Sequence, residues 1–488
     1  MEISPNSDEI KKSKAPKSVY FILISTFLER YSTTGTNVIL LLYLNTKLGF
    51  DQNLSTALFH VNQFLINFFS IFAAIIADSY IGLFKTLIIM SLIFAIGTGI
   101  ITASGIEALN VSVITFTLIG IFIAVIGSGS VRATLTAFGG HQFKTPEQAD
   151  LLKHFFSAHL LFLNLGSLLG RIGNPILRED VSCFGTNGCY PLAFGLPSIA
   201  MFIALIVLIC GKSFYIHKAP TDNIFLKFCN CIICGLKEFF KRNKKIERKN
   251  HWLDYAIIKY NQKLINDTKQ VLKILKIFLP IPIYWAVYAQ QSSRWIFQAT
   301  QMNLDLGWFV VKPDQMIALN PIFSLIFLPI CNFIFYPLLS KIQIHSNLHK
   351  IAFGGFLCCA AFTIAIFIEL EIEQNFISIL WILPQFAVLA LSEKFVFSSL
   401  LHFGFTEGPT SMKSIMTACV FVTIAFGNLI VTIVSALNLF SSLVYEFTFY
   451  VCLLFIAMII FMFIIRNFEY SNEKSEEDDN EIYDDTNL

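Results

Sequence analysis

The stretch "FLERYSTTG", residues 27–35, places two adjacent charges, Glu29 and Arg30, inside an apolar run that begins near Val19 and ends near Leu44. A run of this length matches the roughly 20 apolar residues that a membrane-spanning helix needs. On insertion scales, a charged side chain at the centre of such a helix costs about 2.5–3.5 kcal/mol. The stretch therefore indicates a membrane helix and a functional reason for charge within it.

The composition indicates a polytopic membrane protein. Of 488 residues, 55% are hydrophobic and only 14% are charged, which is too little charge to cover a soluble protein of this size. The formal net charge of +2 gives no indication of a nucleic-acid partner. The chain shows no nucleophile–base pair, metal-ligand spacing or phosphate loop, so we expect neither an enzyme nor a bound cofactor.

Twelve apolar segments are long enough to cross a bilayer, and a long polar linker separates the first six from the last six. This pattern predicts an all-α transmembrane fold with two six-helix halves and a substrate site between them, as in secondary transporters. The predicted spans are 19–44, 54–77, 84–104, 111–137, 154–176, 191–211, 271–296, 314–338, 350–370, 376–403, 412–436 and 443–465. The predicted organisation is a cytosolic N-terminal segment (1–18), an N-terminal half (19–211), a cytosolic basic linker with an amphipathic helix (212–270), a C-terminal half (271–465) and an acidic, disordered tail (466–488).

Lysine and arginine predict the orientation. Basic residues gather at the N-terminus, in the 212–270 linker and in the loops of the same side, so we expect this side and both termini to face the cytosol. The run "KRNKKIERKN" (241–250) predicts contact with anionic lipid, in addition to the bilayer that surrounds the spans. The plasma membrane is the default location, and we expect a monomer.

Four charges fall within three of the predicted spans, namely Glu29, Arg30, Arg132 and Glu393. Because a charge at membrane depth needs a partner or water, four of them together indicate one aqueous cavity. Arginine binds a carboxylate through two hydrogen bonds, whereas a glutamate suits an ammonium group, so the cavity suits a zwitterion. An asparagine or histidine taken alone is more often an interhelical hydrogen-bonding residue.

Two groups of cysteines lie outside the apolar segments. Cys183 and Cys189 flank the polar loop "CFGTNGC", and if that loop is external, a disulfide between them is plausible, although the sequence leaves it open. The group "CNCIIC" (229–234) lies in the predicted cytosolic linker without a histidine pair at ligand spacing. It alternates with apolar residues and therefore favours an interfacial helix over a metal site.

Several long segments, in order along nearly the whole membrane portion, resemble signatures of the proton-dependent oligopeptide transporter family of the major facilitator superfamily. "ERYSTTG" (29–35) resembles the first-span signature E-x-x-E-R-F-x-Y-Y-G, and "ADSYIGLFKT" (77–86) resembles A-D-S-W-L-G-x-F-K-T. "GSGSVRATLTAFGGHQF" (127–143), "FFSAHLLFLNLGSLL" (155–169) and "PTSMKSIMTACVFVTIAFGNLI" (409–430) resemble three further signatures. The chain looks most like animal-type members, but it lacks the large external domain that they insert between spans nine and ten.

This resemblance implies the major facilitator fold and alternating-access import of di- and tripeptides with the proton as coupling ion. It implies that Arg30 binds the peptide carboxylate and that Arg132, where the family has a lysine, assists it. The residues that match positions for the peptide's amino end are Asn164, Asn320 and Glu393, and Trp285 would line a side-chain pocket. The candidates for proton coupling are Glu29, His60 and Glu393.

The departures from the family signatures are concentrated in the proton machinery. Thr26 stands for the first glutamate of E-x-x-E-R, and Ala289 stands for the seventh-span aspartate. Thr33 and Thr34 stand for two tyrosines, and His141 stands for the aspartate of G-G-D-Q-F. We therefore expect a peptide site that is more intact than the proton path.

Two alternatives remain open. The first is an uncoupled or differently specific facilitator of small anions or peptide-like compounds, which the loss of both tyrosines favours. The second is a non-transporting peptide sensor, with the acidic tail or the basic linker as its output. Conventional peptide transport is the leading hypothesis, because "FGGHQF" and "ADSYIGLFK" are maintained.

Overall fold

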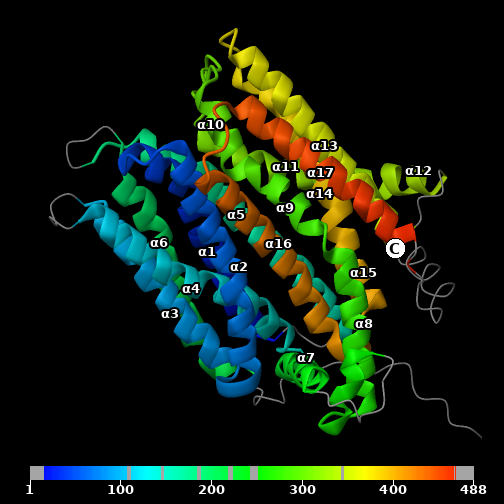
Figure 1. The fold of residues 1–488 in the computed structure, drawn as a ribbon. Helices are drawn as coiled ribbons and strands as arrows, with labels where there is room; N and C mark the ends of the chain where they lie inside the picture. Colours follow the sequence, from blue (N-terminus) through cyan, green and yellow to red (C-terminus); the bar gives the residue numbers. More distant parts are fainter. Residues whose placement is uncertain are drawn as a thin grey trace, which may run out of the picture.

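The computed structural model describes residues 16–106, 112–143, 148–183, 188–217, 224–241, 251–341, 346–466 and 468. Within these ranges the chain is built from helices, and β contacts are limited to isolated bridges such as Asn303 with Ser378 and Asp305 with Val310. Long helices run side by side and slant across the molecule from one end to the other (Figure 1). The all-α expectation is confirmed.

The N-terminal half contains six long helices, and each corresponds to one predicted span. Two of them, α1 and α2, continue into a π-helical turn, at Tyr43–Lys47 and Ala77–Ile81 respectively. The six are α1 (Ser18–Leu42), α2 (Gln52–Ile76), α3 (Leu83–Ser104), α4 (Val113–Gly140), α5 (Ala149–Glu179) and α6 (Tyr190–Cys210).

The C-terminal half also corresponds to six predicted spans, but three of these are broken into shorter helices. The seventh begins at Gln262, earlier than predicted, and bends by 49° between Phe278 and Ile281. Pro280 and Pro282 flank this bend, and proline cannot donate the backbone hydrogen bond that a continuous helix needs. The helices are α8 (Gln262–Phe278), α9 (Ile281–Ala289), α10 (Arg294–Thr300), α11 (Leu319–Ile330), α12 (Tyr336–Lys341), α13 (Asn347–Ile372), α14 (Leu383–Glu393), α15 (Ser399–Glu407), α16 (Lys413–Ala436) and α17 (Leu443–Arg466).

Ten of the described helical segments are long and apolar enough to cross a membrane, and the bent pair α8–α10 is an eleventh. The remaining predicted span is α1, whose 25 residues extend about 37 Å at 1.5 Å per residue. Its polar middle, with Glu29, Arg30 and several hydroxyl side chains, explains why its apolar character is weaker than that of the others. The chain is thus a multi-pass membrane protein with the two-half architecture of the major facilitator fold.

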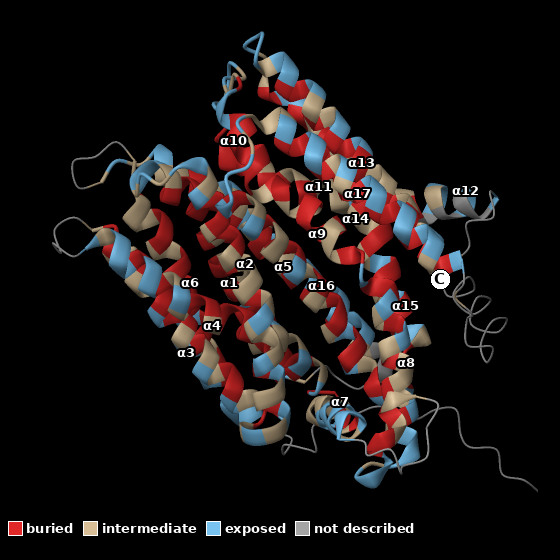
Figure 2. Ribbon diagram, in the orientation of Figure 1, coloured by how far each residue is buried: buried red, intermediate tan, exposed pale blue. Residues whose placement is uncertain are grey.

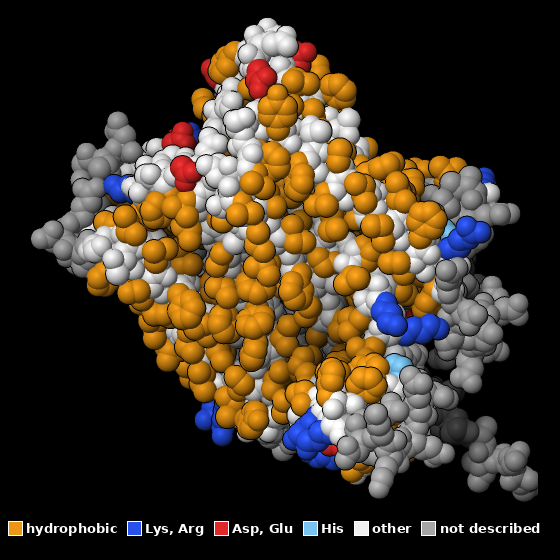
Figure 3. All heavy atoms as spheres, viewed as in Figure 1, with side chains coloured by type: hydrophobic (Ala, Val, Ile, Leu, Met, Phe, Trp, Pro, Cys, Tyr) orange, Lys and Arg blue, Asp and Glu red, His pale blue; other side chains and the backbone are white. Residues whose placement is uncertain are grey.

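Each half has its own apolar core. Buried side chains of α1, α3, α4 and α6 form one cluster, which includes Ile22, Phe94 and Phe194. A second cluster is drawn from the C-terminal half and includes Trp295 and Phe362. Buried residues follow the inward faces of the helices (Figure 2), yet hydrophobic side chains also cover much of the face that Figure 3 shows. Such an outer face suits lipid and not water.

Small residues let α3 and α4 lie in direct backbone contact. A Cβ added at Gly127 would collide with the backbone of Phe94 and lie 2.6 Å from the carbonyl oxygen of Met90. A Cβ added at Gly97 of α3 or at Gly120 of α4 would likewise collide with the other helix of the pair. The two helices therefore pack without intervening side chains, as membrane helices with small interfacial residues do.

In the described part of the linker between the halves lie the helix α7 (Ile224–Phe240) and a 3₁₀ turn at Trp252–Ile258. Cys231 of α7 and Leu253 of the turn are fully buried in a small apolar cluster with Ile265 of α8. The carboxylate of Asp254 accepts a hydrogen bond from the ammonium group of Lys269 on α8. Burial acts to raise the pKa of Asp254, but the hydrogen bond and the positive charge of Lys269 outweigh it and hold that pKa below its usual range. Most of the basic run 241–250 lies outside the described residues.

A disulfide joins Cys183 and Cys189 in the segment between α5 and α6, with a Cα–Cα distance of 5.2 Å. The backbone amide of Cys189 also donates to the carbonyl oxygen of Arg178, at 2.9 Å. The turn that connects the two helices is therefore tied to the end of α5.

The glycine contact between α3 and α4 generates a stability prediction. Gly127→Ala places a methyl group against the backbone of α3, and we expect a loss of about 1–3 kcal/mol, seen as a lower melting temperature of the purified protein. Gly173→Ala in α5 is the matched control, because a Cβ there meets nothing within 4 Å. Equal melting temperatures of the two variants would contradict the close contact.

Candidate functional site

Three arginines of the N-terminal half lie close enough to interact electrostatically. They are Arg30 on α1, Arg132 on α4 and Arg171 on α5. Gly166 and Gly170 of α5 bring α1 and α5 together, since a Cβ at Gly166 would lie 3.2 Å from the Cβ of Arg30. Three like charges at membrane depth repel one another, so the arrangement favours an anionic group among them.

The arginines face a space that solvent reaches. Arg132 is exposed although it lies in the middle of α4 and interacts with Arg30 and Glu29 of α1. The Arg30 side chain is 12% exposed, and its only ion pair among the described residues is a long one, 3.8 Å, to its neighbour Glu29. Arg30 and Arg132 therefore lie near each other, and solvent reaches at least part of each side chain.

A carboxylate lies across from the arginines on the C-terminal half. Glu393, at the end of α14, interacts electrostatically with Tyr288 and with Arg171. The amide of Asn320 donates to the Tyr288 oxygen at 3.2 Å. Glu393, Tyr288 and Asn320 thus form one polar group at the face that the C-terminal half turns toward the arginines.

Arg30 and Glu393, the positive and the negative pole of the site, each retain a hydrogen-bonding atom without a partner among the described residues. The Nε–H of Arg30 is buried and has no acceptor among the described residues, and Oε2 of Glu393 is buried and has no donor among them. An unpaired buried donor or acceptor costs about 1–3 kcal/mol, and more when the group is charged. A bound molecule that carries a carboxylate at one end and an ammonium at the other would satisfy both atoms.

The other predicted binding residues lie near this site in different environments. Asn164 lies on α5 seven residues before Arg171, and hence on the same face of that helix. Trp285 is only 3% exposed and packs edge-on against Tyr288, with ring centroids 5.4 Å apart. Its indole N–H has no partner among the described residues.

His60 connects the two halves. It is fully buried on α2, its Nδ1 lies 2.9 Å from Oδ1 of Asn428 on α16, and its Nε2 lies 2.8 Å from Oγ of Ser293. In the neutral ring, Nδ1–H donates to the Asn428 carbonyl and Nε2 accepts from the Ser293 hydroxyl. Protonation adds a donor at Nε2, so the Ser293 hydroxyl must then turn and accept.

The surroundings of Thr26 contain a second buried histidine. His159 of α5 is 4% exposed, and its Nδ1 lies 3.2 Å from Oγ1 of Thr26. Its Nε2 lies 3.1 Å from Oγ1 of Thr136 on α4. Glu29 lies on α1, the helix that carries Thr26. It is also buried, and its carboxylate accepts a hydrogen bond from the Thr33 hydroxyl at 2.9 Å. Hydroxyl and imidazole groups therefore occupy the region where the family signature would place a carboxylate.

Two ion-pair groups join the halves at the end of the molecule where α5 ends and α17 begins. Arg178 of α5 makes two 3.2 Å hydrogen bonds to the fully buried Asp314, and Lys312 lies 2.6 Å from Asp180. These contacts close the two halves against each other at that end.

The second group is centred on Arg294, which begins α10. Its Nε donates to Glu446 of α17 at 2.9 Å, and a terminal nitrogen donates to Oδ1 of Asn53 on α2. Arg294 and Glu446 are 2% and 4% exposed. Because Arg294 follows Ser293 directly, this group is continuous with the contacts of His60.

The sequence reasoning did not single out Arg171, His159, Tyr288 or the two ion-pair groups as site residues. Arg171 and His159 both lie within the predicted span 154–176, so the rule that identified Arg30 applied to them as well. The partners Arg178 and Asp314 are 136 positions apart, and nothing in a single sequence connects them. Among the described residues, no group of three or more His, Cys, Asp or Glu side chains could hold a metal ion.

Comparison with known proteins gives a consistent result. The sequence profile of the POT family matches residues 84–443. The chain is 39% identical over 372 residues to human solute carrier family 15 member 2, covering 75% of this chain and 51% of that protein. It is 37% identical over 359 residues to peptide transporter family 1 of Drosophila melanogaster, covering 74% and 48%. The chain thus spans about half the length of the curated relatives that it matches.

Solved structures show the same fold. The crystal structure of the POT family transporter PepTSo superposes with a TM-score of 0.82 and 22% identity, covering 93% of this chain and 98% of that one. An auto-inhibited POT family peptide transporter superposes with a TM-score of 0.80 and 20% identity, covering 94% and 99%. At these identities the superpositions establish the fold alone.

The Arg294 group generates a second stability prediction. Glu446→Ala leaves the Arg294 charge buried without its carboxylate, and breaking a buried pair in this way costs about 3–5 kcal/mol. We expect a large drop in melting temperature and in the yield of monodisperse protein. Glu371→Ala on the exposed end of α13 removes the same group and should change little. A melting temperature of Glu446→Ala close to that of the control would contradict the pairing.

Proposed function

The chain belongs to the POT family of transporters, and on that premise we propose that it carries di- and tripeptides across the membrane by alternating access. It is a multi-pass membrane protein with the major facilitator fold and not an enzyme. The relatives that match it include a peptide transporter, which supports peptides as the substrate class.

The observation that carries the proposal is the pair of unused polar atoms on opposite halves. Arg30 Nε–H requires an acceptor and Glu393 Oε2 requires a donor. A short peptide supplies a terminal carboxylate for the first and a terminal ammonium for the second. When the two halves close on a peptide, the separation of Arg30 and Glu393 would limit the length of peptide that can bind both, which favours two or three residues over longer chains.

Arg132 and Arg171 would add positive charge around the peptide carboxylate, while Tyr288 and Asn320 would orient Glu393 at the ammonium end. Asn164 lies on the α5 face that carries Arg171 and would hydrogen-bond the peptide. Trp285 would bound one side-chain pocket through its contact with Tyr288. Each of these roles rests on the placement of the residue beside one of the two poles.

Alternating access requires the contacts between the halves to break and re-form. The contacts of Arg178 with Asp314, of Arg294 with Asn53, and of His60 with Ser293 all cross between the halves. In the proposed cycle they separate when the halves part at that end, and a peptide then reaches the site from outside. Peptide bound to both poles would favour their closure.

We propose the proton as the coupling ion, with His60, Glu29 and Glu393 as the groups that exchange it. His60 is the best placed, because both of its ring nitrogens bond to the C-terminal half while the residue itself belongs to the N-terminal half. A proton gained or lost there changes the contacts on which closure depends. The side chains of Thr26 and Ala289 cannot take up or release a proton in this way.

We further propose that both termini and the 212–270 linker face the cytosol, that the basic run 241–250 contacts anionic lipid, and that the protein is a plasma-membrane monomer. On the visible face, acidic side chains gather at the upper end, and basic side chains lie at the lower edge and along the right-hand side (Figure 3). Basic residues favour the cytosolic side of membrane proteins.

Arg30→Ala tests the carboxylate pole. We expect dipeptide uptake by vesicles that contain the variant to fall at least about a hundredfold, since a charge-assisted pair contributes roughly 3 kcal/mol. Arg30→Lys should recover part of the uptake, and Arg466→Ala at the exposed end of α17 should leave it unchanged. Unchanged dipeptide uptake by Arg30→Ala, or competition by nitrate or free amino acids as strong as that by dipeptides, would refute the peptide site.

Peptide-driven acidification of the vesicle lumen tests the coupling. We expect acidification with the native chain, and we expect His60→Gln to lose it while it still exchanges labelled for unlabelled peptide. The matched control is His402→Gln, because His402 is exposed on α15 and its ring bonds to Asn347 of α13 in the same half. Exchange without acidification by the native chain would show an uncoupled facilitator, and acidification retained in His60→Gln would exclude His60 as the carrier.

A further inference from the structure

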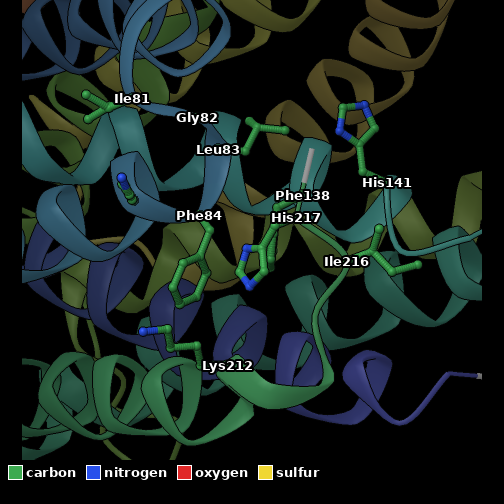
Figure 4. A pocket seen from close by; sticks show the side chains of 10 residues that line it. Ile81, Gly82, Leu83, Phe84, Phe138, His141, Lys212, Ile216 and His217 are labelled. Atoms are coloured by element: carbon green, nitrogen blue, oxygen red, sulfur yellow. The ribbon is translucent and has the colours of Figure 1, made fainter. Parts of the chain in front are cut away.

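A cavity of about 430 Å³ lies where three spans of the N-terminal half end, away from the peptide site (Figure 4). The start of α3, the end of α4 and the segment after α6 form its walls. No residue of the proposed peptide or proton path lines it.

The cavity combines an apolar lining with cationic groups at its edge. Ile81, Leu83, Phe84, Phe138 and Ile216 supply the apolar surface. The nitrogen-bearing side chains that line it are Lys85, Lys212, His141 and His217. Neither lysine forms an ion pair within the described part of the chain, and both are exposed.

One wall of the cavity is held in place by specific contacts. The fully buried Gln142 accepts from the backbone amide of Ile216 at 2.8 Å and donates to the carbonyl oxygen of Ile216 at 3.3 Å. The Tyr215 ring packs edge-on against Phe138 at 5.0 Å, and the His217 ring packs edge-on against Phe84 at 5.0 Å. The segment 215–217 is therefore fixed against α3 and α4, and the cavity is part of the fold.

Within the described part of the chain, positive charge exceeds negative charge around the cavity. Asp78, just before α3, interacts with His141, so that histidine lies near a carboxylate. None of the described residues that line the cavity is an aspartate or a glutamate. Lys85 and Lys212 form no ion pair with a described residue, and the first turn of α3, which contributes Leu83, Phe84 and Lys85 to the lining, adds the positive end of a helix dipole.

From this combination we propose that the cavity binds the phosphate-bearing headgroup of one anionic phospholipid from the leaflet that it faces. The position at the ends of three spans is the depth at which headgroups lie. Lys85 and Lys212 would pair with the phosphate, and the apolar lining would receive the glycerol and the first part of the acyl chains. A soluble phosphate compound would satisfy the lysines but would leave the apolar lining exposed to water.

This site differs from the general attraction of the basic linker for anionic lipid, because it is a defined cavity with a fixed wall. It does not depend on peptide transport, so the two proposals can fail separately. In the orientation proposed above, the lipid would come from the cytosolic leaflet.

The test is a titration of the purified full chain in neutral detergent with dioctanoyl phosphatidic acid, followed by thermal shift. We expect a saturable rise in melting temperature, while dioctanoyl phosphatidylcholine and glycerol phosphate produce little. The variant Lys85→Gln with Lys212→Gln should bind the acidic lipid roughly tenfold more weakly, because each lysine near a lipid phosphate contributes appreciably to affinity. Leu83→Trp fills the cavity, keeps every cation and should weaken binding as well.

The matched control is Lys273→Gln with Lys276→Gln on α8, which removes the same charge from exposed positions outside both the cavity and the basic linker. Its titration should match that of the native chain. Equal weakening in both double variants would show diffuse attraction and would overturn the proposal. So would native binding in the cavity variants, or a response to glycerol phosphate equal to the response to the lipid.

Discussion

This structure depends on one constraint: the N-terminal half carries buried positive charge, the C-terminal half carries a buried negative charge, and both face the space between the halves. The arginines of α1, α4 and α5 cannot neutralise one another, and Glu393 lies on the other half. At membrane depth, where the effective dielectric is low, such charges interact strongly and their desolvation is costly. The halves must therefore enclose water or a ligand that carries both charges, and the packing of α1 against α5 through Gly166 and Gly170 keeps the positive pole in position.

The polar contacts between the halves concentrate at one end of the molecule. His60, the Arg178–Asp314 pair and the Arg294–Asn53 contact each join an element of one half to an element of the other. All three consist of hydrogen bonds between small sets of polar atoms. They lie beside an apolar contact, because Ile296, Phe297 and Ile317 of the C-terminal half are buried in the apolar cluster of the N-terminal half. Water can replace the hydrogen bonds at modest net cost, whereas separating the apolar contact would expose it fully. The apolar part of this boundary is therefore the larger barrier to parting the halves at this end.

Much of the architecture was readable from the sequence, because span length and apolar composition respond to the thickness of the bilayer. The twelve segments, the two halves and the charges of α1, α4 and α14 followed from that rule. The breaks within the C-terminal half were missed in detail, since Pro280 and Pro282 interrupt hydrogen bonding without interrupting the apolar run. Arg171 was overlooked although the same rule applied to it. The pairing of Arg178 with Asp314 and the bridge from Thr26 through His159 to Thr136 depend on tertiary contacts over long sequence separations, which no local pattern encodes.

The glycines between α3 and α4 have a mechanical consequence. With backbone against backbone, a rotation of either helix that turned a larger neighbouring side chain into the contact would meet the backbone of the other helix. We therefore expect α3 and α4 to move as one unit, because no flexible side chains lie between them to absorb a displacement. The prolines near the middle of the seventh span, where the helix already bends, are a place where the molecule can yield instead.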